Sequence, residues 1–328
     1  MRIIDATLLA LEATGGGLSD ADEDAWRRAA AEGRVGPLET IWPEKTPSRA
    51  LAPEPPPLSG GESAAPQPAA PFPEKLARLT STLLLPSAKA LDELSPSVFS
   101  GGRRCCLYGL GDALSIGWDS AFRRLESLSA SSGALLTPCF TNERGCATAL
   151  TVEWLLGRAE RAAVVSFAGC GGLAALEEVL AALRVYGALP DADLAALPKL
   201  AALYSRLGGA PISPVKAVIG EAVFYVEAGI HVDGLGKSPD LYEPFPPESV
   251  GRERRIVMGK HSSRRSVLAK CAALDLPMTE ALAGRLLKRL KEESVKRGAS
   301  LHDEDFINLY STCRAGRDER KESSHAAL

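Results

Sequence analysis

Short apolar runs alternate with helical patterns along the first two thirds of the chain. Residues 1–11 are mostly apolar and predict a buried strand that leads into a loop ending at glycines 15–17. Residues 19–33 predict one polar helix, since Ser19 can cap its start and Gly33 can end it. Further strands are expected within residues 83–85, 105–112, 133–145 and 162–172. Strands alternating with helices indicate an α/β fold.

The last third of the chain is more helical. Residues 180–207 predict two alanine- and leucine-rich helices broken by Pro190 and Pro198. Residues 279–297 have apolar positions at helical spacing and a lysine-rich outer face. Because acids alternate with the bases there, we interpret this helix as solvated rather than as a nucleic-acid surface. Residues 314–328 predict a frayed tail.

Composition narrows the class of protein. The chain has 328 residues and a formal net charge of -3 with mixed signs, which argues against a nucleic-acid partner. It contains no run of eighteen apolar residues, and the first residues enter a strand pattern at once, so we expect no membrane span, no signal segment and a cytoplasmic protein. The seven cysteines form no CxxC pair, which favours free thiols over a disulfide framework or structural zinc.

Residues 211–263 carry the candidate chemistry. This glycine- and proline-rich stretch holds two of the four histidines, His231 and His261. Gly229 and Gly234 flank His231, which predicts a short segment where the backbone turns or approaches another chain closely. A histidine there can act as a base near neutral pH.

Three neighbours could assist His231. Glu227 or Asp233 could orient its second ring nitrogen, and the Tyr242 hydroxyl could share a proton with it. The residues alone leave a structural alternative open, in which His231 is a loop histidine bonded to backbone and Tyr242 packs on prolines.

The order of residues in this stretch resembles a known family. Residues 220–251 read GEAVFYVEAGIHVDGLGKSPDLYEPFPPESVG and residues 254–264 read RRIVMGKHSSR. Both resemble the linker and first C-terminal subdomain of the homocitrate synthase and isopropylmalate synthase family, especially the bacterial homocitrate synthases of nitrogen fixation. The resemblance implies condensation of acetyl-CoA with a 2-oxo acid, and places His231 and Tyr242 in the acid/base machinery.

The resemblance also reveals departures at the family's metal centre. Residues 5–15 align with the first barrel strand, where Leu9 replaces the catalytic arginine and Glu12 is retained. The four positions that bind the divalent metal in the family carry residues unsuited to that ion: Ala10, Cys139, Thr141 and Ala168. The family uses Mg, Mn or Zn; we expect none bound by this chain.

The family fold is a TIM-type βα barrel followed by small helical subdomains. We therefore predict a barrel-like domain over residues 1–188 and a linker with C-terminal subdomains over residues 189–328, with the family's lid region at 211–263. Only residues 12–104 are available for four βα units of about 30 residues each. A proline-rich insert at about 43–73, read as an extended linker, takes part of that length, so the barrel is expected to be incomplete or compressed.

The resemblance implies an oligomer in which the lid serves the neighbouring subunit. The first hypothesis is that this chain completes the site of a metal-competent homocitrate synthase, with His231, Tyr242 and Glu12 as its candidate catalytic residues. A second is a catalytically inactive paralogue with a structural or regulatory role, or an isopropylmalate-synthase-like acyltransferase. A third is an active enzyme in which Glu12, Asp112 and Cys139 form a zinc site.

Overall fold

The chain forms two compact units. The computed structural model describes residues 1–13, 18–32, 38–40, 72, 76, 81–99, 104–157 and 160–325. The N-terminal unit is Met1–Ile219 and the C-terminal unit is Gly220–Leu328. The predicted domain division at residues 188 and 189 falls within the N-terminal unit, and the proline-rich insert lies outside the described residues apart from Phe72.

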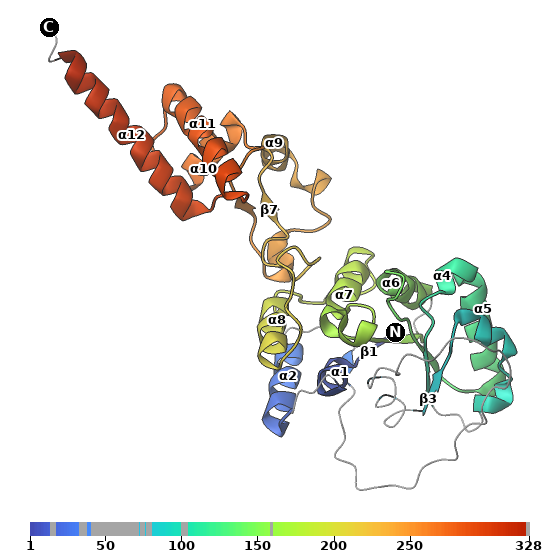
Figure 1. The fold of residues 1–328 in the computed structure, drawn as a ribbon. Helices are drawn as coiled ribbons and strands as arrows, with labels where there is room; N and C mark the ends of the chain where they lie inside the picture. The colour runs from blue at the N-terminus through green and yellow to red at the C-terminus, as the bar shows by residue number, and fades with distance from the viewer. Residues whose placement is uncertain are drawn as a thin grey trace. The chain divides into compact units, whose positions relative to one another are not determined.

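The described residues of the N-terminal unit form six parallel strands, of which β1 and β3 are labelled in Figure 1. One sheet has the order β2-β1-β6 and the other the order β3-β4-β5, and every pairing is parallel. The strands are β1 (Arg2–Asp5), β2 (Leu38–Thr40), β3 (Ser81–Leu84), β4 (Cys105–Tyr108), β5 (Leu136–Cys139) and β6 (Ala162–Val165). Strands β5 and β6 are spatial neighbours, so the two sheets follow one another. The predicted α/β class with parallel strands is confirmed, whereas a compressed barrel stays a prediction.

Helices follow most of these strands. Their bounds are α1 (Thr7–Ala13), α2 (Asp20–Glu32), α4 (Ala113–Ile116), α5 (Trp118–Ser132), α6 (Ala147–Gly157), α7 (Leu176–Val185) and α8 (Leu197–Arg206). Three 3-10 helices complete the described elements: η1 (Ala88–Glu93), η2 (Pro96–Phe99) and η3 (Phe167–Gly172). Pro198 lies in the first turn of α8, where its missing N–H needs no partner, so it starts a helix instead of breaking one.

Two helix starts illustrate how local sequence sets these elements. At α2, the Asp22 N–H donates to Ser19 Oγ at 3.3 Å and the Ser19 N–H donates to Asp22 Oδ2 at 3.0 Å, which confirms the predicted cap. The loop predicted after β1 is wrong, because helix α1 begins there. Buried Asp5 accepts the Thr7 N–H at 2.9 Å, so its carboxylate satisfies a free donor at the start of α1.

The C-terminal unit is a short parallel strand pair and a helical cluster. Its elements are β7 (Tyr225–Val226), α9 (Gly229–Lys237), η4 (Pro239–Leu241), η5 (Pro247–Val250), β8 (Arg255–Ile256), α10 (Arg264–Ala273), α11 (Glu280–Arg297) and α12 (Asp303–His325). Met258, Val267, Leu286 and Phe306 are fully buried in its core. The predicted helix at 279–297 is confirmed, with Thr279 as its N-cap. Helix α12 runs through most of the segment predicted to fray.

Within the described residues, no helix has the length and apolar character needed to cross a membrane.

Candidate functional site

His231 lies on a helix and not on a turn, which corrects the sequence prediction. Gly229 and Gly234 are both part of α9, and neither needs a positive φ. Their role is close packing: a Cβ built on Gly229 would overlap the side chain of Ser263, the residue that caps α10. The glycines therefore let α9 lie directly against its neighbours, and this fixes where His231 points.

Tyr242 meets His231 as the resemblance implied. The two ring centroids are 5.2 Å apart with an interplanar angle of 86°, an edge-to-face contact. A Cβ built on Gly234 would overlap the Tyr242 ring, so this ring occupies the space left by the missing side chain. The structure thus brings together two of the three predicted site residues.

We expect Gly234→Ala to lower the free energy of unfolding by about 1–3 kcal/mol and to displace Tyr242 from His231, because the added methyl group has no room. Urea unfolding would measure the stability, and the ring resonances of Tyr242 would report its contact with His231. Gly236→Ala is the matched control, since Gly236 is in the same helix and its Cβ would meet open space. Equal stability of the two variants would contradict this packing.

The carboxylates expected to orient His231 bind other groups. Glu227 accepts hydrogen bonds from the His261 N–H at 2.9 Å and from Ser300 Oγ at 2.6 Å. Asp233 pairs with Lys237 at 2.8 Å and with Arg265, and these cations hold its pKa below the usual value. Glu227 and Asp233 therefore brace the C-terminal unit, and the expectation that one of them orients the imidazole is wrong for this structure.

The surface around His231 is open and apolar. His231 is exposed, as are Ile230 at 79%, Leu241 at 80% and Tyr242 at 42%. We call these four residues the α9 face. Exposed aliphatic side chains beside a polar pair are typical of a surface that another molecule covers. The four residues of the α9 face therefore combine a contact between the His231 and Tyr242 rings with two exposed aliphatic side chains.

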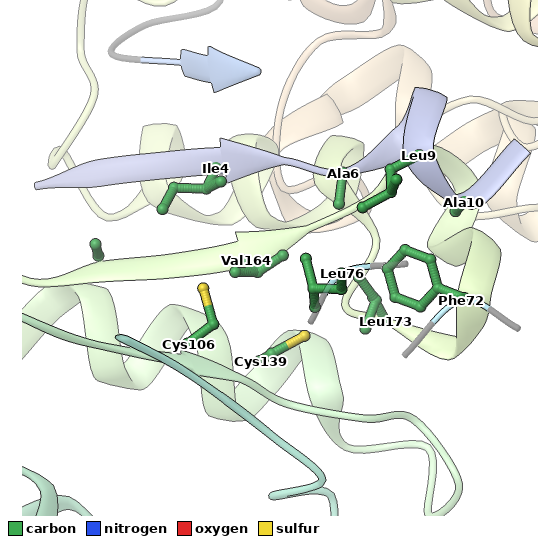
Figure 2. Close-up of a cluster of buried hydrophobic side chains, with 11 residues drawn as sticks. Ile4, Ala6, Leu9, Ala10, Phe72, Leu76, Cys106, Cys139, Val164 and Leu173 are labelled. Carbon is green, nitrogen blue, oxygen red and sulfur yellow. The ribbon is translucent and has the colours of Figure 1, made fainter. Parts of the chain in front are cut away.

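The family's metal positions in the N-terminal unit form packed core instead. Leu9, Ala10 and Cys139 are at most 1% exposed and belong to one hydrophobic cluster with Ile4 and Leu173 (Figure 2). Burial raises the pKa of the Cys139 thiol well above its usual value, so the sulfur stays protonated. A divalent cation would find methyl groups and a neutral thiol here.

The two remaining metal positions are equally unsuited. Thr141 is buried and forms an isolated bridge with Leu173, while the Ala168 N–H donates to Glu177 Oε2 at 2.8 Å. Across the described parts of the chain, no three His, Cys, Asp or Glu side chains come together as a metal site. The residues present do not fit the divalent metal that the family uses.

Glu12 lies on α1 and is half-buried in the N-terminal unit. The alternative zinc site required it to meet Asp112 and Cys139. Asp112 Oδ1 instead accepts the Ala88 N–H at 2.7 Å, and Cys139 faces the apolar cluster. These three side chains are described, and they do not gather into a metal site.

The comparisons with known proteins concern both units. Residues 218–298 match the family model described as "Homocitrate synthase post-HMGL domain-like". Homocitrate synthase 1 of Nostoc sp. is 37% identical over 171 residues, covering 51% of this chain and 45% of that protein. The chain is therefore similar to homocitrate synthases over these residues.

Two other relatives also match only part of this chain and part of their own length. The omega subunit of homocitrate synthase from Clostridium pasteurianum is 29% identical over 188 residues, covering 57% of this chain and 53% of that protein. The protein named 2-isopropylmalate synthase 2 from Caldanaerobacter subterraneus is 38% identical over 140 residues, covering 42% of this chain and 36% of that protein. The chain thus spans about half the length of these relatives or less.

The sequence around Gly229 and Gly234 left two interpretations open, a turn of the backbone or a close approach of another part of the chain. The structure supports the second. Gly229 is the first residue of α9 and Gly234 lies inside it, although helices usually disfavour glycine. Close approach of a neighbouring side chain is the other common reason for a glycine, and it applies to both.

Proposed function

We propose that this chain is a homocitrate-synthase-like protein that has no metal centre of its own and supplies His231 and Tyr242 to the site of a metal-competent partner subunit. The reaction of that complex would be the condensation of acetyl-CoA with 2-oxoglutarate and hydrolysis to homocitrate. The observation that carries the proposal is a contrast: Ala10 and Cys139, at two of the four metal positions, lie in buried hydrophobic core, whereas His231 and Tyr242 are in ring contact and exposed.

The chemistry divides between two halves. One half must hold the 2-oxo acid and stabilise the charge that develops on its oxygen, and Leu9 and Ala10 offer nothing for that task. The other half must remove a proton from the acetyl methyl group, which suits the His231 imidazole. Tyr242, at its edge, would hold or return a proton at its hydroxyl.

The partner is expected to contact the α9 face. Ile230 and Leu241 are apolar and exposed, so covering them removes apolar surface from water and favours association. The existence of a relative named as a subunit of homocitrate synthase is consistent with a chain that works beside another. We propose a metal-competent homocitrate synthase subunit as the covering molecule in the active complex, and a second copy of this chain in the inactive alternative. We also propose Glu12 as a catalytic residue that this chain retains from the family.

A second candidate is a catalytically inactive paralogue with a structural or regulatory role. It is favoured by the engagement of Asp233 with Lys237 and Arg265, since an imidazole without an orienting carboxylate is a weaker base. An isopropylmalate-synthase-like acyltransferase is the remaining alternative, and it would use another 2-oxo acid.

We expect the purified chain alone to release no CoA from acetyl-CoA in the presence of 2-oxoglutarate, with Mg, Mn or Zn added. The reason is that the groups that hold and polarise the 2-oxo acid are absent from the metal positions. A thiol-detecting assay would measure the release, and a panel of other 2-oxo acids would address the acyltransferase alternative. Sustained turnover by the lone chain with any of these metals would refute the proposal.

A further inference from the structure

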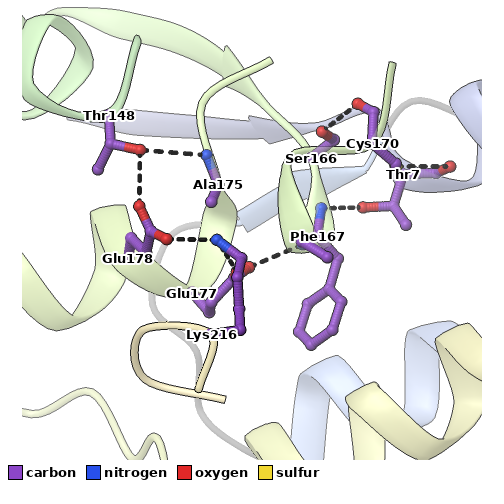
Figure 3. A network of polar contacts seen from close by, with 10 residues as sticks. Thr7, Thr148, Ser166, Phe167, Cys170, Ala175, Glu177, Glu178 and Lys216 are labelled. Atoms are coloured by element: carbon purple, nitrogen blue, oxygen red, sulfur yellow. Dashed lines mark hydrogen bonds and ion pairs between the residues drawn. The ribbon is translucent and has the colours of Figure 1, made fainter. Parts of the chain in front are cut away.

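The last residues of the N-terminal unit, 213–219, form a segment that we call the linker. Lys216 extends from the linker to the start of α7 (Figure 3). Its Nζ pairs with Glu178 and lies 3.4 Å from Glu177 Oε1. Glu178 also accepts a hydrogen bond from Thr148 Oγ1 at 3.0 Å, so the contact is anchored on α6 as well.

Glu177 is an unusual partner because its side chain is 0% exposed. Its Oε2 accepts the Ala168 N–H at 2.8 Å, while its Oε1 has no hydrogen bond within the described structure other than the longer approach of Lys216. A buried carboxylate needs a compensating charge or proton. Lys216 supplies that charge from a segment in which residues 213–215 and 217 are exposed and Val218 and Ile219 are buried.

The linker itself has a strained backbone. The Lys216 N–H donates to the Ser213 carbonyl at 2.9 Å and closes one turn. The Ile219 N–H then donates to the Ala217 carbonyl at 2.8 Å, which closes a γ-turn around Val218 with φ +67. A β-branched residue is rarely stable in the left-handed region, so neighbouring contacts must hold the turn in place.

We propose that Lys216 is a latch: its pairing with ionised Glu177 and with Glu178 holds the linker in this strained form, and loss of the pairing releases the linker from α7. Ile219 is the last residue of the N-terminal unit, so the latch acts where the C-terminal unit begins. This inference does not depend on the proposed reaction.

The latch responds to pH through Glu177. Burial raises the pKa of Glu177 to about 7, and Lys216 opposes this by favouring the charged form. Release of Lys216 would therefore raise the pKa of Glu177 further, which means that the latched form is favoured as pH rises through 7 and is weakened below it. The other titratable groups around Glu177 are Glu178 on its own helix, Cys170 in η3 and Tyr204 in α8.

Cys170 and Tyr204 do not titrate in this range. Burial raises the pKa of each to about 12, so both stay neutral between pH 6 and pH 8. Glu177 and Lys216 therefore determine the pH response of the linker.

Hydrogen exchange of the linker amides in the full chain tests the latch. Protection factors, which correct for the intrinsic pH dependence of exchange, would be measured at pH 6 and pH 8 for the amides of residues 216 and 219, which donate hydrogen bonds within the linker. We expect Lys216→Met and Glu177→Gln to lower protection at pH 8 by about tenfold, the size of effect expected for a partly buried ion pair. Lys89→Met, at an exposed lysine far along the chain, is the matched control and should change nothing.

The pH dependence of the protection factors gives a second, independent test. Wild-type protection should fall between pH 8 and pH 6, and Glu177→Gln should show no such fall. If Lys216→Met does not fold, Glu178→Gln replaces it and should also lower protection at pH 8, by a smaller factor. Unchanged protection in these variants, or a wild-type pH dependence that persists in Glu177→Gln, would overturn the latch.

Discussion

A His231→Ala variant of this chain is expected to lose about 10²–10⁴-fold of the condensation rate that the wild-type chain supports in complementation. In that assay, the chain is mixed with a metal-competent homocitrate synthase whose own counterpart of His231 has been replaced by alanine. In this mixture, our chain supplies the histidine base and the synthase supplies the intact metal centre. Release of CoA from acetyl-CoA in the presence of 2-oxoglutarate is measured.

The expected loss follows from the place of His231 on the α9 face. Its imidazole is exposed beside Tyr242, so it can reach a substrate held by another subunit, and alanine removes the base without disturbing the core. His302→Ala is the matched control, because His302 is also an exposed histidine of the C-terminal unit but lies in the turn before α12. Equal rates for wild type and His231→Ala, or no complementation at all, would favour the inactive paralogue.

Ala10→Asp is expected to lower the free energy of unfolding of the chain by about 3–5 kcal/mol. This substitution restores the residue type that the family uses to bind its metal. Ala10 is 0% exposed in the hydrophobic cluster around Leu9 and Cys139, and the described residues of that cluster include no charged side chain. A carboxylate introduced among these groups would lose its hydration without gaining a partner of opposite charge. The variant would therefore be destabilised, or it would fold only with this carboxyl group protonated.

Chemical denaturation at pH 7 would measure this loss. Ala31→Asp, at an exposed position of α2, provides the control and should change stability by less than about 1 kcal/mol. Full stability of Ala10→Asp together with tight binding of Mn or Mg would mean that the cation site survives, and the proposal of a metal-deficient chain would fall.

The strands were the most predictable part of the fold. Apolar runs such as those in β4, β5 and β6 are buried on both faces, which is why they read as continuous hydrophobic stretches. Helix α2 was predictable from Ser19 because its cap depends on residues three positions apart. Local sequence was sufficient in these cases.

Features that depend on distant contacts were less predictable. Helix α1 begins where Asp5 satisfies the Thr7 N–H, and α9 is helical because Ser263 and Tyr242 fill the space beside its glycines. The meeting of His231 with Tyr242 was predicted from their chemistry and not from periodicity, and the family resemblance placed both in the acid/base machinery. The approach of Lys216 to Glu177 joins residues 39 positions apart, and no pattern in the sequence marks it.

The apolar cluster around Ala10 also bears on how this lineage can change. Ala10 and Cys139 occupy two of the family's ligand positions and are now part of the core. A single reversion to a charged or polar residue at either would be selected against, because it would destabilise the fold without creating a complete cation site. Loss of the centre is then hard to reverse by stepwise mutation. Under the proposed function, natural variation at these positions should be limited to hydrophobic side chains of similar volume, and the α9 face should change little.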